Sequence, residues 1–293
     1  MTAEAVILDI AVGELHCTIV PEIGGGLARF DWRGIPVLRP WDCTTHDPNA
    51  LGCYPLVPWS NRISGGGIEA GGRFWPLQPN WPGEPYPIHG DGWRRPWRVE
   101  RHTVGEVVLS LDSNEQPPFD YHAQLTYGLT DDGLTMRLSV EHRGGVPTPY
   151  GLGFHPWLPR TRGTMLELPA TEVWLETADY MPAGKVPIGD RPNWDFAQAR
   201  PLPASWINNG FTGWSGTARV IWPEHGLQLS VSATPELGTC IVYSPSVDAT
   251  FFCLEPASHP VDAFHLPGMP GLRVLRAGEC LDVTCTFNVR ATG

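Results

Sequence analysis

The chain has 293 residues, of which 42% are hydrophobic, and its formal net charge is -11. Such an acidic chain repels phosphates and anionic lipid headgroups, so neither nucleic acid nor a membrane surface is an expected partner. The 31 Pro and 33 Gly disfavour long helices, while 13 Trp and the large apolar fraction exclude disorder. We expect one domain over residues 1–293, because all-β domains often reach this length.

Alternation of apolar and polar residues predicts β-strands along much of the chain. A short alternation covers 107–111, and a strand at 122–129 is expected to form a hairpin with the clear alternation from Gly133 to Gly144. Further alternations occur at 166–168, 227–233 and 281–289. Because no stretch of a dozen residues keeps an apolar period of 3.6, the sequence predicts an all-β fold.

Segments 59–93, 144–163 and 181–204 are rich in Pro and Gly and are expected to form loops. They contain aromatic residues, which is not typical of a linker. Residues 1–17 lack a basic region followed by a long apolar stretch, and no later segment approaches 18 apolar residues. We therefore expect a soluble, cytoplasmic protein.

The seven Cys form no CxxC pair, and an odd number without an export signal favours reduced, mostly buried thiols. No HExxH motif or comparable close spacing of His and carboxylates occurs. We expect no metal site and no cofactor.

Two candidate binding residues lie in the first Pro/Gly-rich segment. Arg62 follows Pro58-Trp59-Ser60-Asn61 and precedes Ser64 and three glycines. Its five fixed donors could grip two sugar hydroxyls or a ring oxygen, although a surface arginine is the alternative. His89 lies in a loop with several aromatic residues. This setting suits an imidazole that contacts a ligand, and a structural histidine is the alternative.

Two titratable residues are candidates for acid and base catalysis. His155 precedes a proline, which restricts His155 to an extended backbone and fixes where its imidazole points. It is a candidate general acid, and a histidine that only caps a loop is the alternative. Glu255 interrupts an apolar, aromatic strand, where a charge is costly unless it is paired or used. It is the best candidate for a base, unless its side chain simply reaches water.

Tryptophans concentrate around these motifs, and indole rings can stack on the flat apolar faces of sugars. Most are expected to lie in the core, with one or two in contact with a ligand; Trp157 is the one we assign to the sugar. The six tryptophans are Trp59, Trp75, Trp81, Trp93, Trp97 and Trp157.

An ordered set of short motifs resembles the aldose 1-epimerase (galactose mutarotase) family, and most closely a branch of uncharacterised bacterial members. The motifs are Asn61-Arg62-Ile63, His89-Gly90, Gly153 to Pro156, Asp179 to Gly184, Asp195-Phe196, Asn208 to Phe211 and Glu255-Pro256. The resemblance implies a large antiparallel β-sandwich with a sugar in an open cleft on one sheet. It also implies a monosaccharide as the partner, no cofactor, and a monomer or homodimer.

The resemblance further implies that Glu255 takes the proton from the anomeric hydroxyl while His155 protonates the ring oxygen. Asn61, Arg62 and His89 would hold the substrate. The active form would have Glu255 ionised and His155 protonated, which predicts a bell-shaped dependence of kcat/KM on pH. Many relatives have Asp where this chain has Asn208, so the preference among sugar hydroxyls is expected to differ.

Two other functions remain open at the level of sequence. A hexose-6-phosphate 1-epimerase would need a phosphate site, for which Arg94, Arg95 and Arg98 are candidates. A sugar-binding module without turnover would keep the fold, but it would have no need of a matched acid and base such as His155 and Glu255.

Overall fold

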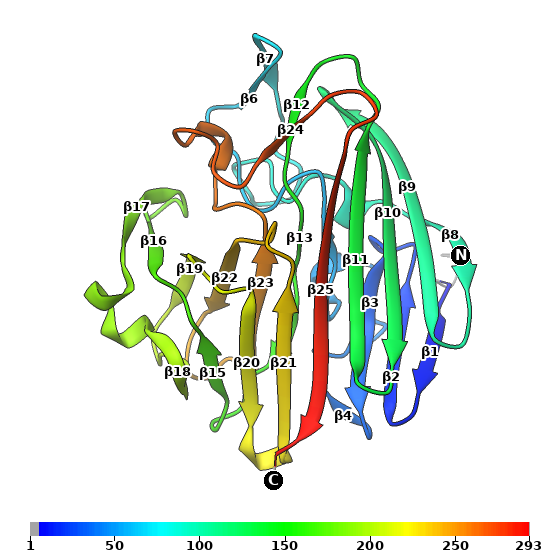
Figure 1. The fold of residues 1–293 in the computed structure, drawn as a ribbon, viewed down its shortest axis with the longest axis vertical. Coiled ribbons are helices and arrows are strands. Elements are labelled where there is room, and N and C mark those ends of the chain that lie inside the picture. The colour runs from blue at the N-terminus through cyan, green and yellow to red at the C-terminus, as the bar shows by residue number, and fades with distance from the viewer. Residues whose placement is uncertain (1–5, 293) are drawn as a thin grey trace.

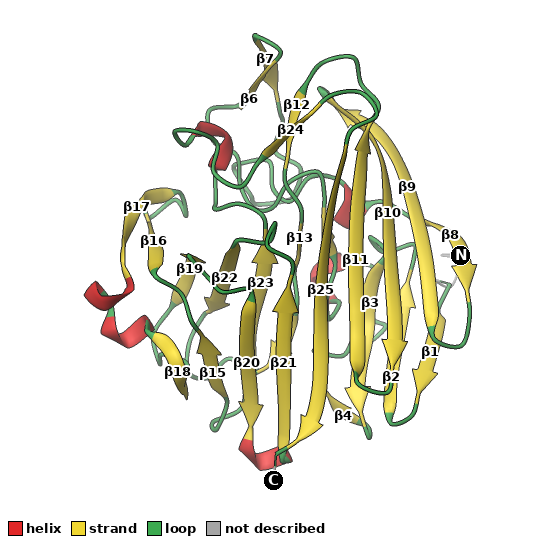
Figure 2. Ribbon diagram, viewed as in Figure 1, coloured by secondary structure: helices red, strands yellow, loops and turns green. Residues whose placement is uncertain are grey.

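Two large antiparallel sheets form most of the molecule. The computed structural model describes residues 6–292, and strands dominate it in Figure 2. In Figure 1 the larger sheet lies toward the viewer and the smaller one lies behind it. The fold class predicted from the alternating patterns, an all-β antiparallel sandwich, is confirmed.

The larger sheet has nine strands in the order β18-β15-β20-β21-β25-β11-β10-β9-β8. In that order their bounds are Phe196–Pro201, Met165–Leu168, Thr217–Trp222, Leu227–Ala233, Cys280–Ala291, Gly133–His142, Phe119–Thr130, Glu106–Gln116 and Arg98–His102.

The second sheet has eight strands in the order β17-β16-β19-β22-β23-β13-β5, with β14 also paired to β23. The bounds of those seven strands are Pro182–Pro187, Glu172–Glu176, Ile207–Thr212, Thr239–Ser244, Phe251–Ala257, Gly153–Phe154 and Pro55–Leu56, and β14 spans Trp157–Pro159.

Smaller sheets and short helices complete the fold. One sheet contains β1 to β4, at Leu8–Val12, Leu15–Val20, Gly26–Trp32 and Ile35–Pro36. The pairs β6–β7 and β12–β24 comprise Gly67–Ala70 with Arg73–Pro76 and Thr148–Tyr150 with Arg273–Leu275. The 3-10 helices η1 to η6 are Pro48–Ala50, Gly92–Arg94, Ile188–Asp190, Pro192–Trp194, Pro223–His225 and Ala263–His265. Within residues 6–292, no helix has the length and apolar character needed to cross a membrane.

The core lies between the two large sheets, and the period of two decides which side chains enter it. On β11, Leu134 and Met136 are buried in the core, as the sequence pattern predicts. On β23, Phe252 and Leu254 point into the same core. Glu255 alternates with Leu254 and therefore lies on the opposite face of the eight-stranded sheet.

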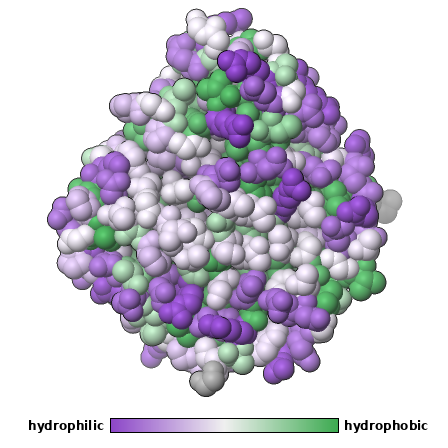
Figure 3. Space-filling view, viewed as in Figure 1, coloured by the Kyte–Doolittle hydropathy of each residue, from purple (hydrophilic) through white to green (hydrophobic). Residues whose placement is uncertain are grey.

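The predicted hairpin is confirmed, since β10 and β11 pair from Tyr121 opposite His142 to Thr130 opposite Gly133. The three segments expected to be loops are only partly so, because they contain β6, β7, β12, β13, β14, β17 and β18. The partners of β12, β13 and β14, which are β24 and β23, are distant in sequence, and such pairing overrides local propensity. The pairs β6–β7 and β16–β17 are local in sequence. The face seen in Figure 3 is mostly hydrophilic or intermediate, with scattered hydrophobic spots.

Candidate active site

Strand register places four side chains in one row on the outer face of the eight-stranded sheet. Asn208 pairs with Tyr243, Tyr243 with Cys253, and Cys253 with Trp157. Glu255 lies two residues beyond Cys253 on the same strand and the same face. A pocket of about 330 Å³ opens above this row, a size at the lower end of the range for small-molecule sites.

His155 and Glu255 meet on the floor of this pocket. Their Nε2 and Oε1 atoms lie 3.4 Å apart, and the two residues are only 7% and 3% exposed. His155 is fixed by its backbone N–H, which donates to the carbonyl of Tyr54 at 3.0 Å. Gly153 lets β13 approach β23, because a Cβ there would lie 2.8 Å from the Pro256 carbonyl oxygen. Nδ1 of His155 and Oε2 of Glu255 are buried without a hydrogen-bond partner in the described chain.

Aromatic rings hold the His155 imidazole where no hydrogen bond does. The Trp157 ring stacks on the imidazole with 5.1 Å between centroids, and the Tyr54 ring packs against the same imidazole at 4.7 Å. The guanidinium of Arg39 lies over the Trp157 ring at 4.0 Å. Trp157 thus packs against both His155 and Arg39, which helps to fix the position of the imidazole.

Burial disfavours the charged form of both central groups. It raises the pKa of Glu255 from 4.5 to about 8, with Arg62 acting weakly in the opposite direction. It lowers the pKa of His155 from 6.5 to about 3, and the charge of Arg39 adds to this effect. Burial thus favours a proton on Glu255 and a neutral His155, whereas the sequence analysis expects the opposite distribution in the active form.

Asn61 and His89 lock each other in place. Both have a φ of 59°, in the left-handed region that non-glycine residues rarely adopt. The backbone N–H of Asn61 donates to Nδ1 of His89 at 2.9 Å, and the N–H of His89 donates to the carbonyl of Asn61 at 3.0 Å. Burial also lowers the pKa of His89 well below its usual value. Because Nδ1 accepts, neutral His89 carries its proton on Nε2.

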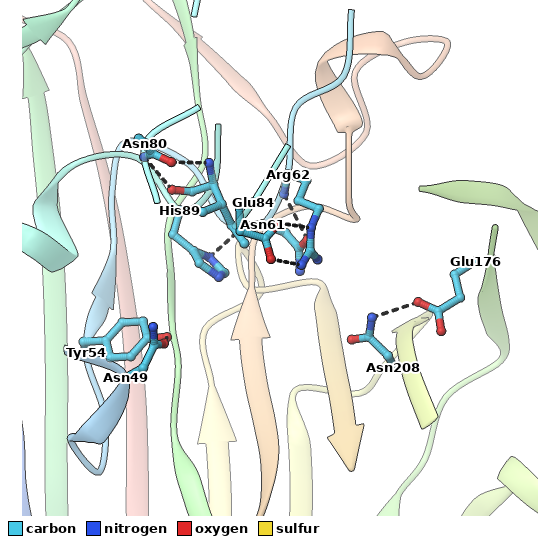
Figure 4. A network of polar contacts seen from close by, with 10 residues as sticks. Asn49, Tyr54, Asn61, Arg62, Asn80, Glu84, His89, Glu176 and Asn208 are labelled. Atoms are coloured by element: carbon cyan, nitrogen blue, oxygen red, sulfur yellow. Dashed lines mark hydrogen bonds and ion pairs between the residues drawn. The ribbon is translucent and has the colours of Figure 1, made fainter. Parts of the chain in front are cut away.

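Arg62 is oriented by a carboxylate that the sequence analysis did not single out. Its Nε and Nη2 donate to Oε2 and Oε1 of Glu84 at 2.8 and 2.6 Å, a bidentate pair. Tyr180 packs against the guanidinium at 5.0 Å. Figure 4 shows Arg62, Glu84 and His89 on one side of the site and Asn208 and Glu176 on the other.

Asn208 faces the pocket from β19 and is held by Glu176. Its Nδ2 donates to Oε2 of Glu176 at 2.8 Å, while the Trp206 indole donates to Oε1 of the same carboxylate at 2.7 Å. Trp206 is 40% exposed, which leaves part of its ring open toward solvent and ligand.

The structure brings together all seven residues that the sequence analysis assigned to the site: Asn61, Arg62, His89, His155, Trp157, Asn208 and Glu255. Others in the pocket lining were not assigned: Asn49, Tyr54, Trp81, Glu84, Ile88, Trp93, Tyr180, Trp206 and Tyr243. Of the six tryptophans considered, Trp81, Trp93 and Trp157 line the pocket. Glu84 and Trp206 come from Pro-containing segments, and the only sequence signal was their proximity to other site motifs.

The three arginines considered for a phosphate site lie outside the pocket lining. Arg94 donates to the carbonyl of Asn80. Arg95 pairs with Glu115 at 2.9 Å and Arg98 with Glu100 at 2.6 Å. Each of these cations is thus engaged separately, and they do not converge on one point.

One group of side chains in the described part of the chain has the spacing of metal ligands. It consists of His155, Cys253 and Glu255, whose ligand atoms lie within 4.8 Å of one another. Metal binding requires a thiolate and a carboxylate, whereas burial raises the pKa of both Cys253 and Glu255. Burial alone therefore favours the protonated thiol and carboxyl over the forms that ligate a metal ion.

Comparisons with known proteins place the chain in a family and agree with the fold. The family model described as aldose 1-epimerase matches residues 11–288, and the chain belongs to this family. YphB, an uncharacterised protein of Escherichia coli K12, is 35% identical over 262 residues, or 87% of this chain and 89% of YphB. YihR, another uncharacterised protein of that strain, is 27% identical over 275 residues, or 88% of this chain and 85% of YihR.

Solved structures show the same architecture. A provisionally named aldose 1-epimerase from Escherichia coli K12 superposes with a TM-score of 0.91 at 32% identity, over 98% of this chain and 99% of that one. A galactose mutarotase-like protein from Clostridium acetobutylicum has a TM-score of 0.87 at 16% identity, over 100% of this chain and 97% of that one. The second similarity shows the fold alone.

Proposed function

We propose that this protein is an aldose 1-epimerase that interconverts the α and β anomers of a free, neutral aldohexose. The observation that carries the proposal is the buried pair of His155 and Glu255, whose facing atoms lie 3.4 Å apart on the floor of a hexose-sized pocket. Anomer exchange needs one group to remove a proton from O1 and another to supply one to O5. A pure sugar-binding site has no need of such a pair.

This pair can open the sugar ring by taking one proton from the substrate and giving one proton to it. Glu255, as carboxylate, takes the proton of the anomeric hydroxyl while His155, as imidazolium, gives its proton to O5. The C1–O5 bond breaks, and C1 and O1 become an aldehyde. Rotation about C1–C2 and the reverse transfers then yield the other anomer.

The effect of burial on the two groups supports this sequence of steps. After ring opening, Glu255 carries the proton and His155 is neutral, and burial favours this same distribution. The buried environment therefore stabilises the open-chain complex relative to the ion pair. Stabilising the least stable species on the pathway lowers the barrier more than uniform binding does.

His89 supports the same atoms without exchanging a proton. Its Nδ1 is occupied by the Asn61 N–H, so Nε2–H is its available donor. Its ring lies edge-on to His155, with 5.3 Å between centroids. A neutral donor at this place stabilises negative charge that develops on a sugar oxygen.

The charges of the pocket favour a neutral sugar over a sugar phosphate. Among the described residues that line it, Arg62 is the only arginine or lysine. Glu84 already pairs with this guanidinium in a bidentate manner. A phosphate dianion would enter beside Glu84 without an unpaired cation to receive it, which is costly.

The test is NMR of anomer exchange with freshly dissolved α-D-glucose and α-D-galactose. We expect the wild-type protein to accelerate exchange of at least one sugar and Glu255→Gln to abolish the acceleration while sugar binding persists. Binding without acceleration in the wild type would identify a sugar-binding module instead. Acceleration of a hexose 6-phosphate alone would contradict the assignment to neutral sugars.

A further inference from the structure

Behind the wall of the pocket that lies opposite His89, one carboxylate accepts hydrogen bonds from two lining residues. Glu176, at the end of β16, accepts from Asn208 Nδ2 at 2.8 Å through one oxygen and from the Trp206 indole at 2.7 Å through the other. Asn208 and Trp206 line the pocket, whereas Glu176 lies behind them and lines a neighbouring cavity. Glu176 thus acts on the pocket through the two residues in front of it.

The chemistry of this contact decides which way the Asn208 amide points. An ionised carboxylate only accepts hydrogen bonds, so the NH2 group of Asn208 must face Glu176. The amide oxygen is then directed away from Glu176, and Figure 4 shows it on the side of the pocket. The Trp206 indole, which can only donate, occupies the other oxygen of Glu176. Both oxygens therefore act as acceptors, and neither offers a donor to the Asn208 amide oxygen.

We propose that Glu176 is a positioning residue that sets Asn208 as a neutral hydrogen-bond acceptor, so that this wall selects a sugar hydroxyl able to donate. The inference rests on the proposed function for the identity of the ligand class. It adds a determinant of specificity: the substrate carries an unsubstituted hydroxyl against Asn208, and an anionic substituent there would face the nearby carboxylate of Glu176.

Substitutions at 176 and 208 reverse the polarity of the wall in a defined way. In Glu176→Gln, the single amide oxygen of the new side chain continues to accept from the Trp206 indole, so its NH2 group faces Asn208. Asn208 must then turn its oxygen toward Gln and its NH2 group into the pocket. Adding Asn208→Asp restores an acceptor in the pocket, because Asp can accept from the Gln amide and from the sugar at once.

The experiment measures dissociation constants by calorimetry for a hexose and for its singly deoxyfluorinated analogues, since C–F cannot donate a hydrogen bond. We expect the wild type to bind one analogue about tenfold more weakly than the parent sugar, the cost of an unpaired polar group. Glu176→Gln should lose this discrimination, and Glu176→Gln with Asn208→Asp should regain it. Asn208→Asp alone opposes two carboxylates, and we expect at least tenfold weaker binding.

Glu172→Gln is the matched control, because Glu172 lies on the same strand but pairs with Lys185 outside the pocket. It should bind every sugar as the wild type does. Unchanged discrimination in Glu176→Gln, or wild-type binding by Asn208→Asp alone, would overturn the inference. These constants do not depend on turnover, so they test the wall separately from the loss of anomer exchange in Glu255→Gln, which tests the proposed function.

Discussion

Polar groups are unpaired on the floor of the pocket, at His155 and Glu255, but paired on its rim, at Arg62 and Asn208. On the floor, Nδ1 of His155 and Oε2 of Glu255 are buried without hydrogen-bond partners within residues 6–292. On the rim, Glu84 occupies two nitrogens of Arg62, and Glu176 has both oxygens engaged. Unpaired buried groups cost stability, whereas paired groups are held in a fixed geometry. Under the proposed function, this contrast assigns proton transfer to the floor and substrate positioning to the rim.

The largest effect should come from removing either group of the floor. We expect His155→Asn and Glu255→Gln each to lower kcat by about 10²–10⁴-fold, the contribution of a positioned acid or base. KM should change little, because the rim remains intact. Steady-state polarimetry gives both constants, and a variant with near-normal kcat would remove that residue from the chemistry.

The pH dependence should follow the proton count of the floor. Below the pKa of His155, about 3, the pair of His155 and Glu255 holds two protons instead of one. Above the pKa of Glu255, about 8, the pair holds none. Activity therefore falls on both sides, by about tenfold per pH unit beyond each limit. Measurements of kcat/KM above pH 7 test the alkaline limb, and a profile that stays flat up to pH 10 would contradict it.

A smaller effect is expected from loosening the rim. Glu84→Gln removes the charge that orients Arg62, and we expect KM to rise about tenfold with kcat within about threefold. Glu115→Gln is a suitable control, since Glu115 pairs with Arg95 outside the pocket lining. If kcat fell as much as KM rose, Arg62 would act in proton transfer as well as in binding.

The last effect concerns stability rather than activity, and it should be a gain when the floor is neutralised. The raised pKa of Glu255 means that the unfolded chain loses this proton near pH 4.5 but the folded chain only near pH 8. The free energy of unfolding therefore falls as pH rises through this window, by an amount on the order of a few kcal/mol. Glu255→Gln escapes this loss.

We accordingly expect the melting temperature of Glu255→Gln to exceed that of the wild type at pH 8.5, with the difference disappearing toward pH 4. Differential scanning calorimetry across this range provides the measurement. An equal difference at both pH values would mean that packing, rather than the titration of Glu255, causes the gain.

The sequence predicted the fold class and the members of the floor better than it predicted the rim. Alternation along β11 and a carboxylate within an apolar strand are local signals, and both predictions needed only a few neighbouring residues. Glu84 and Glu176 gain their importance from partners 22 and 32 residues away in the chain. No local pattern reports such pairing. The preference of burial for a protonated Glu255 also has no local signal, because it depends on how deeply the side chain is buried.

Glu176 stands on β16, one strand from the edge of the eight-stranded sheet, while Glu255 stands on β23 in its interior. The pairing of β16 with β19 ends at Val173, so Glu176 lies beyond that ladder, whereas Glu255 pairs with Ile241 within the ladder of β22 and β23. A substitution at 176 should therefore disturb the sheet less than one at 255. After gene duplication, a copy can therefore acquire a different sugar by changes near the edge while it inherits its chemistry unaltered. The geometry of one sheet thus offers a route by which preferences diverge faster than the reaction itself.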